Sequence, residues 1–167
     1  MLSLLQSLSS INSHASYDTA LYHSLTANTL FALRQPQPLL LHIQQLQSEY
    51  RLSPSLPLLQ GSYWILIGEA KKAILSFTEV VEKQVDCYDG WLFLGHAYIH
   101  LHDAKASATC YFKAVEVNPR DYRGYHALSE VYRNEHNTNM EYYYLMKAIS
   151  IQYNHSFYLH FTTCFLT

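Results

Sequence analysis

A spacing of 34 residues recurs along this chain and constrains its fold more than any other feature. The segment GWLFLGHAY begins at Gly90, and the similar segment GYHALSEVY begins 34 positions later at Gly124. Small residues recur at the same spacing, and a large residue follows each of them three positions later. The small set is Ala27, Gly61, Gly95 and Ser129, and the large set is Leu30, Trp64, Tyr98 and Tyr132. A fixed period of this length is the mark of a repeat architecture.

Two further ladders occupy the second half of each repeat. The first consists of large residues, Ile43, Phe77, Tyr111 and Leu145, and the second follows three positions later with Leu46, Val80, Ala114 and Ala148. Residues three or four apart share one face of a helix, so the pattern predicts two amphipathic helices in every repeat. One helix pair cannot bury its own apolar stripe, so the pairs are expected to stack. An irregular bundle with an accidental period is the alternative, and four ladders in one frame disfavour it.

The third repeat carries the sharpest motif. Its residues match the tetratricopeptide repeat (TPR) pattern at Trp91, Leu94, Gly95, Tyr98, Tyr111, Ala114 and Pro119. Ser107 departs from that pattern where alanine is usual, and in the fourth repeat Ser129 and Tyr153 replace the glycine and the terminal proline. We therefore predict an all-α TPR superhelical solenoid of about four helix-turn-helix repeats plus flanking helices.

The repeat frame also predicts how the chain is organised. We expect an N-terminal helix in residues 1–19, a TPR array over 20–155, and a C-terminal partial repeat helix over 156–167. The units are placed near 20–53, 54–87, 88–121 and 122–155. Helices are expected near 2–12, 18–33, 38–50, 55–67, 70–84, 88–101, 104–117, 122–135, 138–151 and 155–166. Pro38 suits a first helical position, and Asp121 can cap the helix that follows it.

Composition and motif content exclude several classes of function. The net charge is −2 and only 14% of the residues are charged, whereas nucleic-acid binding requires a basic surface. Apolar runs are shorter than the roughly 18–20 residues of a membrane span, and the opening MLSLLQSLSS lacks the positive charge of a signal peptide. Cys87, Cys110 and Cys164 stand far apart, which is typical of a reduced, intracellular protein.

No catalytic or metal motif is present in the sequence. His96 and His100 share a helical face at the spacing of an HExxH zinc site, but the residue after His96 is Ala97 and no third ligand follows. The five glycines form no phosphate-binding loop, and neither paired carboxylates nor a G-x-S-x-G motif occurs. We expect no enzyme activity, no cofactor and no metal.

A concave groove for other polypeptides is the site that the TPR frame predicts. The second, fifth, ninth and twelfth positions of each unit are expected to face this groove. In the third and fourth units they are Asp89, Leu92, His96, Ile99, Arg123, His126, Glu130 and Arg133. Arg123 and Arg133 can donate forked hydrogen bonds to a carboxylate of a bound peptide. The alternative for Arg133 is an ion pair with Glu130, three residues earlier on the same helix.

Three segments of the third and fourth repeats carry a closer resemblance. They are LGH at Leu94–His96, AVEVNPRDYRGY at Ala114–Tyr125, and LSEVY at Leu128–Tyr132. Through them residues 58–150 resemble the cell division cycle protein 23 family, TPR subunits of the anaphase-promoting complex. The resemblance implies a non-catalytic scaffold of a ubiquitin ligase in cell-cycle control, present in nucleus and cytoplasm. It implies other subunits and activator segments as partners, and leaves a homodimer open.

Two alternatives remain beside this resemblance. The paralogous cell division cycle protein 27 family shares the GH and VNPR features, although both families have several times more repeats than this chain. A generic TPR co-chaperone or adaptor that binds peptides in its groove is the second alternative. Its carboxylate clamp would use Asn28, but Ser62, Asp89 and Phe93 stand where that clamp needs a cation or an amide.

Overall fold

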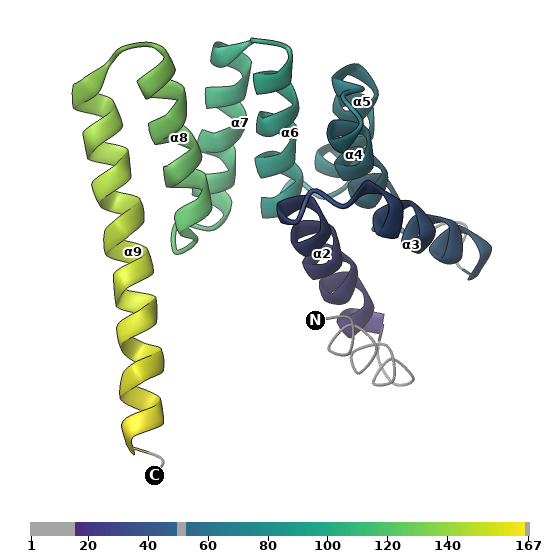
Figure 1. The fold of residues 1–167 in the computed structure, drawn as a ribbon, viewed down its shortest axis with the longest axis horizontal. Coiled ribbons are helices and arrows are strands. Elements are labelled where there is room, and N and C mark those ends of the chain that lie inside the picture. Colours follow the sequence, from purple (N-terminus) through teal and green to yellow (C-terminus); the bar gives the residue numbers. More distant parts are fainter. Residues whose placement is uncertain (1–15, 50–52, 166–167) are drawn as a thin grey trace. The chain divides into compact units, whose positions relative to one another are not determined.

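The computed structural model describes residues 16–49 and 53–165, with side chains over 21–48 and 53–153. These residues form helices and turns without a strand (Figure 1). In chain order the helices are α2 (Ser16–Ala32), α3 (Pro36–Glu49), α4 (Leu56–Leu66), α5 (Ala70–Lys83), α6 (Tyr88–His100), α7 (Ala104–Val117), α8 (Tyr122–Asn134) and α9 (Thr138–Phe165). None of them, within the described residues, is long and apolar enough to cross a lipid bilayer.

The helices α2 to α8 and the start of α9 lie within two residues of the predicted ranges. Asp121 caps α8 as predicted, because its carboxylate accepts a hydrogen bond from the backbone N–H of Arg123. The first helical proline of α3 is Pro36, two residues before the predicted Pro38. The helix predicted near 2–12 lies outside the described residues.

The predicted separation of the last two helices is wrong. Helix α9 runs without a break from Thr138 to Phe165, where helices over 138–151 and 155–166 were expected. The reason lies at Tyr153, which occupies the position of Pro119 one repeat earlier. A proline removes a backbone donor and stops a helix, whereas tyrosine lets it continue. Residues 156–165 therefore extend the second helix of the fourth pair.

The turn inside each helix pair has one repeated conformation. The residues Arg34, Gly68, His102 and His136 have φ angles of 51°, 84°, 59° and 59°, and they too lie 34 positions apart. After each of them, a backbone N–H donates to a carbonyl five residues earlier, as from Asp103 to Tyr98 at 3.0 Å. Only Gly68 is a residue type that favours this left-handed region, so the other three turns carry no such sequence signal.

The chain divides into two compact units, Met1–Lys83 and Gln84–Thr167. In the first unit α4 contacts α2, α3 and α5. One aliphatic core cluster is drawn from α2, α3 and α4; it comprises Ala27, Leu30, Leu39, Ile43, Leu46, Leu56 and Leu59. In the second unit, α6 contacts α7, α7 contacts α8, and α8 contacts α9 (Figure 1). Its core comprises Leu92, Tyr111, Ala114, Ala127, Leu128 and Val131.

Small and large residues of the ladders meet inside the helix pairs. A Cβ atom placed on Gly61 would lie 2.5 Å from the Phe77 ring, and one placed on Gly95 would lie 2.6 Å from Cδ1 of Tyr111. Real Cβ atoms essentially never approach other atoms so closely. Where the ladder offers alanine or serine as the small residue, its large residue is aliphatic, as at Ile43 and Leu145. The small residue therefore has the least volume where the large residue of the same pair is aromatic.

Candidate protein-binding surface

The predicted groove residues of the second unit lie on α6 and α8. Arg123 is the centre of a charged cluster there. Its guanidinium lies 2.7 Å from Oδ2 of Asp121 and 3.2 Å from Oδ1 of Asp89, and it stacks 5.0 Å above the Tyr88 ring. The backbone N–H of Gly124 donates to the Tyr88 hydroxyl at 2.9 Å. This cluster joins the first helices of two successive repeats, so Arg123 is already occupied by carboxylates of its own chain.

The electrostatics of the cluster follow from partial burial and close pairing. Burial alone would lower the pKa of Arg123, but the hydrogen bond to Asp121 and the charges of Asp89 and Asp121 raise it. Burial alone would raise the pKa of Asp121, but hydrogen bonds from the side chain and backbone of Arg123 lower it. Burial and the nearby Asp121 charge raise the pKa of Tyr88. The guanidinium and Asp121 therefore stay ionised at neutral pH, and the phenol stays neutral.

His96 contacts α7, the second helix of its own helix pair. Its Nδ1 lies 2.8 Å from the Tyr111 hydroxyl, and the two rings meet edge to face at 5.5 Å. Burial, together with smaller effects of the charges of His100 and Arg123, lowers the pKa of His96 to about 4. The imidazole is therefore neutral at pH 7 and helps to hold α6 against α7, so it is a weak candidate for binding an anionic peptide group.

Leu92 does not face the surface, which corrects its prediction as a groove residue. Its side chain is 3% exposed and belongs to the core of the second unit. Ile99 is half-buried and packs against that same core. Both side chains join a core to which α7 and α8 also contribute, which spacing along one helix cannot reveal.

Three predicted groove residues form an exposed polar face on α8. His126, Glu130 and Arg133 are four and three residues apart and are all exposed. Arg133 donates from Nε to Oε1 of Glu141 on α9 at 2.7 Å, rather than pairing with Glu130 as the sequence alternative proposed. The surface that remains accessible to a partner is therefore this face of α8, flanked by the Arg123 cluster.

The sequence analysis missed an exposed apolar stripe on α9. Tyr142, Met146, Ile149 and Tyr153 are 65%, 46%, 45% and 72% exposed. Their spacing of four, three and four residues places them on one side of the helix. The signal that identifies them is the 34-residue register, which relates this stripe to residues of α7 that pack against the next repeat.

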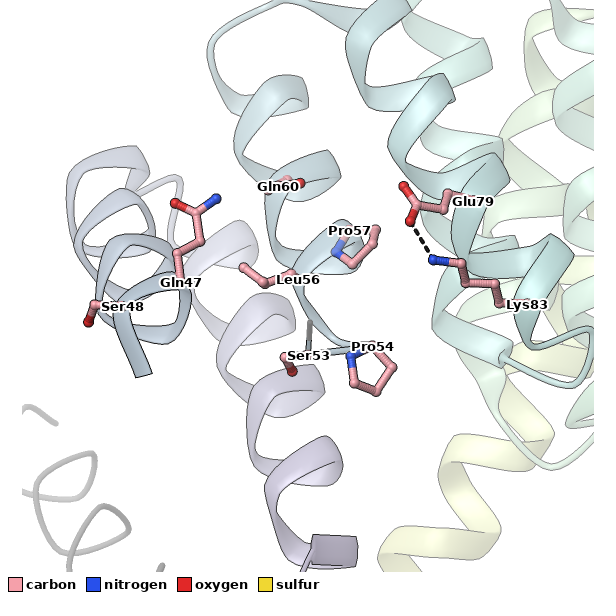
Figure 2. Close-up of a pocket in the computed structure, with 9 residues that line it drawn as sticks. All are labelled: Gln47, Ser48, Ser53, Pro54, Leu56, Pro57, Gln60, Glu79 and Lys83. Atoms are coloured by element: carbon pink, nitrogen blue, oxygen red, sulfur yellow. Dashed lines mark hydrogen bonds and ion pairs between the residues drawn. The ribbon is translucent and has the colours of Figure 1, made fainter. Parts of the chain in front are cut away.

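The first unit has an open pocket of about 730 Å³ between α3, α4 and α5 (Figure 2). Its lining is mostly polar and includes Gln47, Ser53 and Pro57. At its edge Lys83 donates to Glu79 at 2.6 Å, an exposed pair within one helix turn. The two charged residues of its lining therefore pair with each other. In the described part of the chain, no three histidine, cysteine or carboxylate side chains gather as a metal site would require.

The two groove arginines are expected to respond differently to mutation. Arg123→Ala leaves Asp89, itself 18% exposed, without its cation and should lower the free energy of unfolding by about 1 kcal/mol, less than for a fully buried pair because solvent screens the cluster. Arg133→Ala removes only an exposed pair and should leave the unfolding midpoint unchanged. Urea denaturation followed by circular dichroism measures both effects. Equal effects of the two substitutions would contradict the cluster's structural role.

Comparison with known proteins identifies the fold. No protein-family model and no curated protein matches the chain. Among solved structures, it is similar to a chain of the APC/C hetero-tetramer Cut9-Hcn1, with a TM-score of 0.77 and 14% identity over 90% of this chain. It spans 28% of that chain's length. Two structures of MamA match with TM-scores of 0.64 and 0.62 at 15% and 16% identity, over 91% and 83% of this chain and 88% and 76% of theirs.

These matches confirm the predicted fold class. The chain has the all-helical TPR-type repeat fold, which the 34-residue ladders predicted. Such repeats characteristically present extended surfaces to other proteins. The class that the fold defines is therefore a TPR-type helical repeat protein.

Proposed function

We propose that this chain is a non-catalytic TPR scaffold subunit of the anaphase-promoting complex and acts in the nucleus and cytoplasm. The observation that carries the proposal is the resemblance of the third and fourth repeats, through segments such as Ala114–Tyr125, to the cell division cycle protein 23 family. The likeness in fold to a chain of an APC/C assembly supports it. The MamA structures share the fold over 91% and 83% of this chain, so the fold alone does not select the assignment, and the sequence segments carry it.

The proposed partners are other subunits of that complex and activator segments, and the proposed contact surface is the groove face of α8. On one exposed face, Glu130 supplies a negatively charged acceptor, Arg133 a positively charged donor, and His126 a ring nitrogen for a hydrogen bond. The other predicted groove residues, Asp89, His96, Ile99 and Arg123, make contacts within the chain. Leu92 contributes only to folding, because it is buried.

The co-chaperone alternative is less well supported by the geometry. Its carboxylate clamp requires cations or amides where this chain has Ser62 and Phe93, which are 0% and 1% exposed. Asp89, at a third clamp position, would repel a carboxylate ligand. The nearby Arg123 is neutralised by two aspartates of the chain.

Affinity purification of the tagged full chain from its source cells, followed by mass spectrometry, tests the proposal. Subunits of the anaphase-promoting complex should be enriched over an untagged control. The triple variant H126A/E130A/R133A should fold normally and lose about tenfold in recovered complex, the effect of about 1.4 kcal/mol of lost binding energy. The matched control is K113A/E116A, which removes an exposed ion pair on α7, outside the proposed contact surface. Absence of these subunits from the purified material would refute the assignment.

A further inference from the structure

Two histidine rings meet between α2 and α3 in the first unit. Nδ1 of His23 lies 3.1 Å from Nε2 of His42, and the ring centroids are 5.2 Å apart. His23 is 8% exposed, and His42 is half-buried. The ring of Tyr22 meets both rings edge to face, at 5.4 and 5.6 Å. Two imidazole nitrogens, one from each helix, therefore face each other inside a packed cluster of three rings.

The repeat register shows that a helix pair of this fold does not require two histidines here. The later repeats carry other residue types at the same two positions. They are Pro57 and Ser76, Trp91 and Cys110, and Tyr125 and Tyr144. A buried polar pair adds little to stability compared with apolar packing of the same shape, so a departure of this kind is expected at a functional position.

The separation of the two nitrogens matches two ligands of one metal ion. Zinc–nitrogen bonds are about 2.0–2.1 Å long, so an ion bound to both nitrogens at 3.1 Å would make an angle of about 95° with them. A further opening of about 0.3 Å between the nitrogens gives the tetrahedral angle that zinc prefers. The hydrogen that one ring donates must also move to the other nitrogen of that ring. Exchange of the hydrogen bond for an ion therefore needs only a change of tautomer and a small ring movement.

The ligand type selects the class of ion. Neutral imidazole suits Zn²⁺, Cu²⁺ and Ni²⁺, whereas Mg²⁺ and Ca²⁺ take oxygen ligands. Two protein ligands are fewer than the three or four of a permanently bound zinc centre, so water must complete the coordination shell. The partial exposure of His42 gives that water access to the ion. Such an ion exchanges with the solvent.

We propose that His23 and His42 bind one Zn²⁺ ion reversibly and that this ion stabilises the contact between α2 and α3. The sequence analysis expected no metal, because these ligands lie 19 residues apart on different helices and form no spacing motif. The proposal goes beyond the function proposed above, because it concerns the first unit and not the face of α8. Only the folded chain brings the two nitrogens together, so Zn²⁺ stabilises the folded state by mass action.

Calorimetric titration of the metal-free full chain with ZnCl₂ at neutral pH tests the site. Each of His23→Gln and His42→Gln should lower the zinc affinity at least about tenfold, because one of two protein ligands is lost. Circular dichroism shows whether each variant folds. The matched control is His100→Gln, which removes an exposed histidine of α6 and should leave the affinity unchanged. An equal loss in all three variants, or a loss in His100→Gln alone, would overturn the proposal.

Amide hydrogen exchange of the wild-type chain locates the ion without any substitution. Zn²⁺ should slow exchange in α2 and α3 and leave exchange in α8 unchanged, and EDTA should reverse the effect. Equal protection of both units would show unspecific binding, and an absence of protection in α2 and α3 would show that the two histidines share only a hydrogen bond. Either result would overturn the proposal. Neither depends on the anaphase-promoting complex, so failure here and failure of the proposed function are separate observations.

Discussion

Gly95→Ala is expected to lower the free energy of unfolding by about 2 kcal/mol, and Gly95→Leu by more. In an ordinary exposed helix the alanine substitution would instead gain about 1 kcal/mol, because glycine is a poor helix former. The sign reverses here because the added Cβ would lie 2.6 Å from Cδ1 of Tyr111, which is itself 2% exposed and cannot move away. Chemical denaturation of the purified variants measures the change, and a stabilised Gly95→Ala protein would disprove the packing argument.

A matched experiment in the first unit tests the same physics by rescue. Gly61→Ala should be destabilising because of Phe77, and Phe77→Ile alone should be destabilising because it leaves a cavity. The double variant reproduces the pair Ala27 and Ile43, which this chain already uses one repeat earlier. Its loss of stability should be smaller than the sum of the two single losses by about 1 kcal/mol or more. Strict additivity would show that the two positions do not share one packing volume.

The second large effect concerns acid sensitivity. The pKa of His96 is lowered to about 4 in the folded chain by burial, whereas an unfolded histidine has its ordinary value of 6.5. Between these values the unfolded chain binds more protons than the folded chain, so stability falls as the pH falls. The stabilisation is complete above pH 6.5 and is lost progressively towards pH 4. The loss should be about 2–3 kcal/mol, since one pKa unit corresponds to about 1.4 kcal/mol.

The variant His96→Gln isolates this contribution. Glutamine keeps a polar group near the Tyr111 hydroxyl but does not titrate. The free energy of unfolding of the two proteins should be measured in urea at half-unit steps from pH 7 to pH 4. The wild-type curve should fall more steeply than the variant curve, and their difference is the contribution of His96. Two parallel curves would mean that the histidine is protonated in the folded chain as readily as in the unfolded chain.

The candidate surface shows which of its features could be predicted from position within a repeat. Position within a repeat predicted that Asp89, Arg123, His126 and Glu130 face the groove. The structure adds that Arg123 and Asp89 pair across two helices, and it leaves His126 and Glu130 exposed. The prediction failed at Leu92, which is buried in a core that includes residues of α7 and α8. The alternative of an ion pair between Arg133 and Glu130 failed for a related reason, because Arg133 pairs with Glu141 on α9. A helical wheel describes one helix, whereas these contacts come from its neighbours.

The sequence by itself determined the helix pairs and their register, because 3.6-residue periodicity and the 34-residue ladders are properties of the chain alone. The contacts of Gly61 with Phe77 and of Gly95 with Tyr111 came from the structure. Only the tertiary structure decided that three non-glycine residues adopt left-handed turns and that Met146 and Ile149 stay exposed. Exposure and turn conformation depend on what packs against a segment, and that information lies in other parts of the fold.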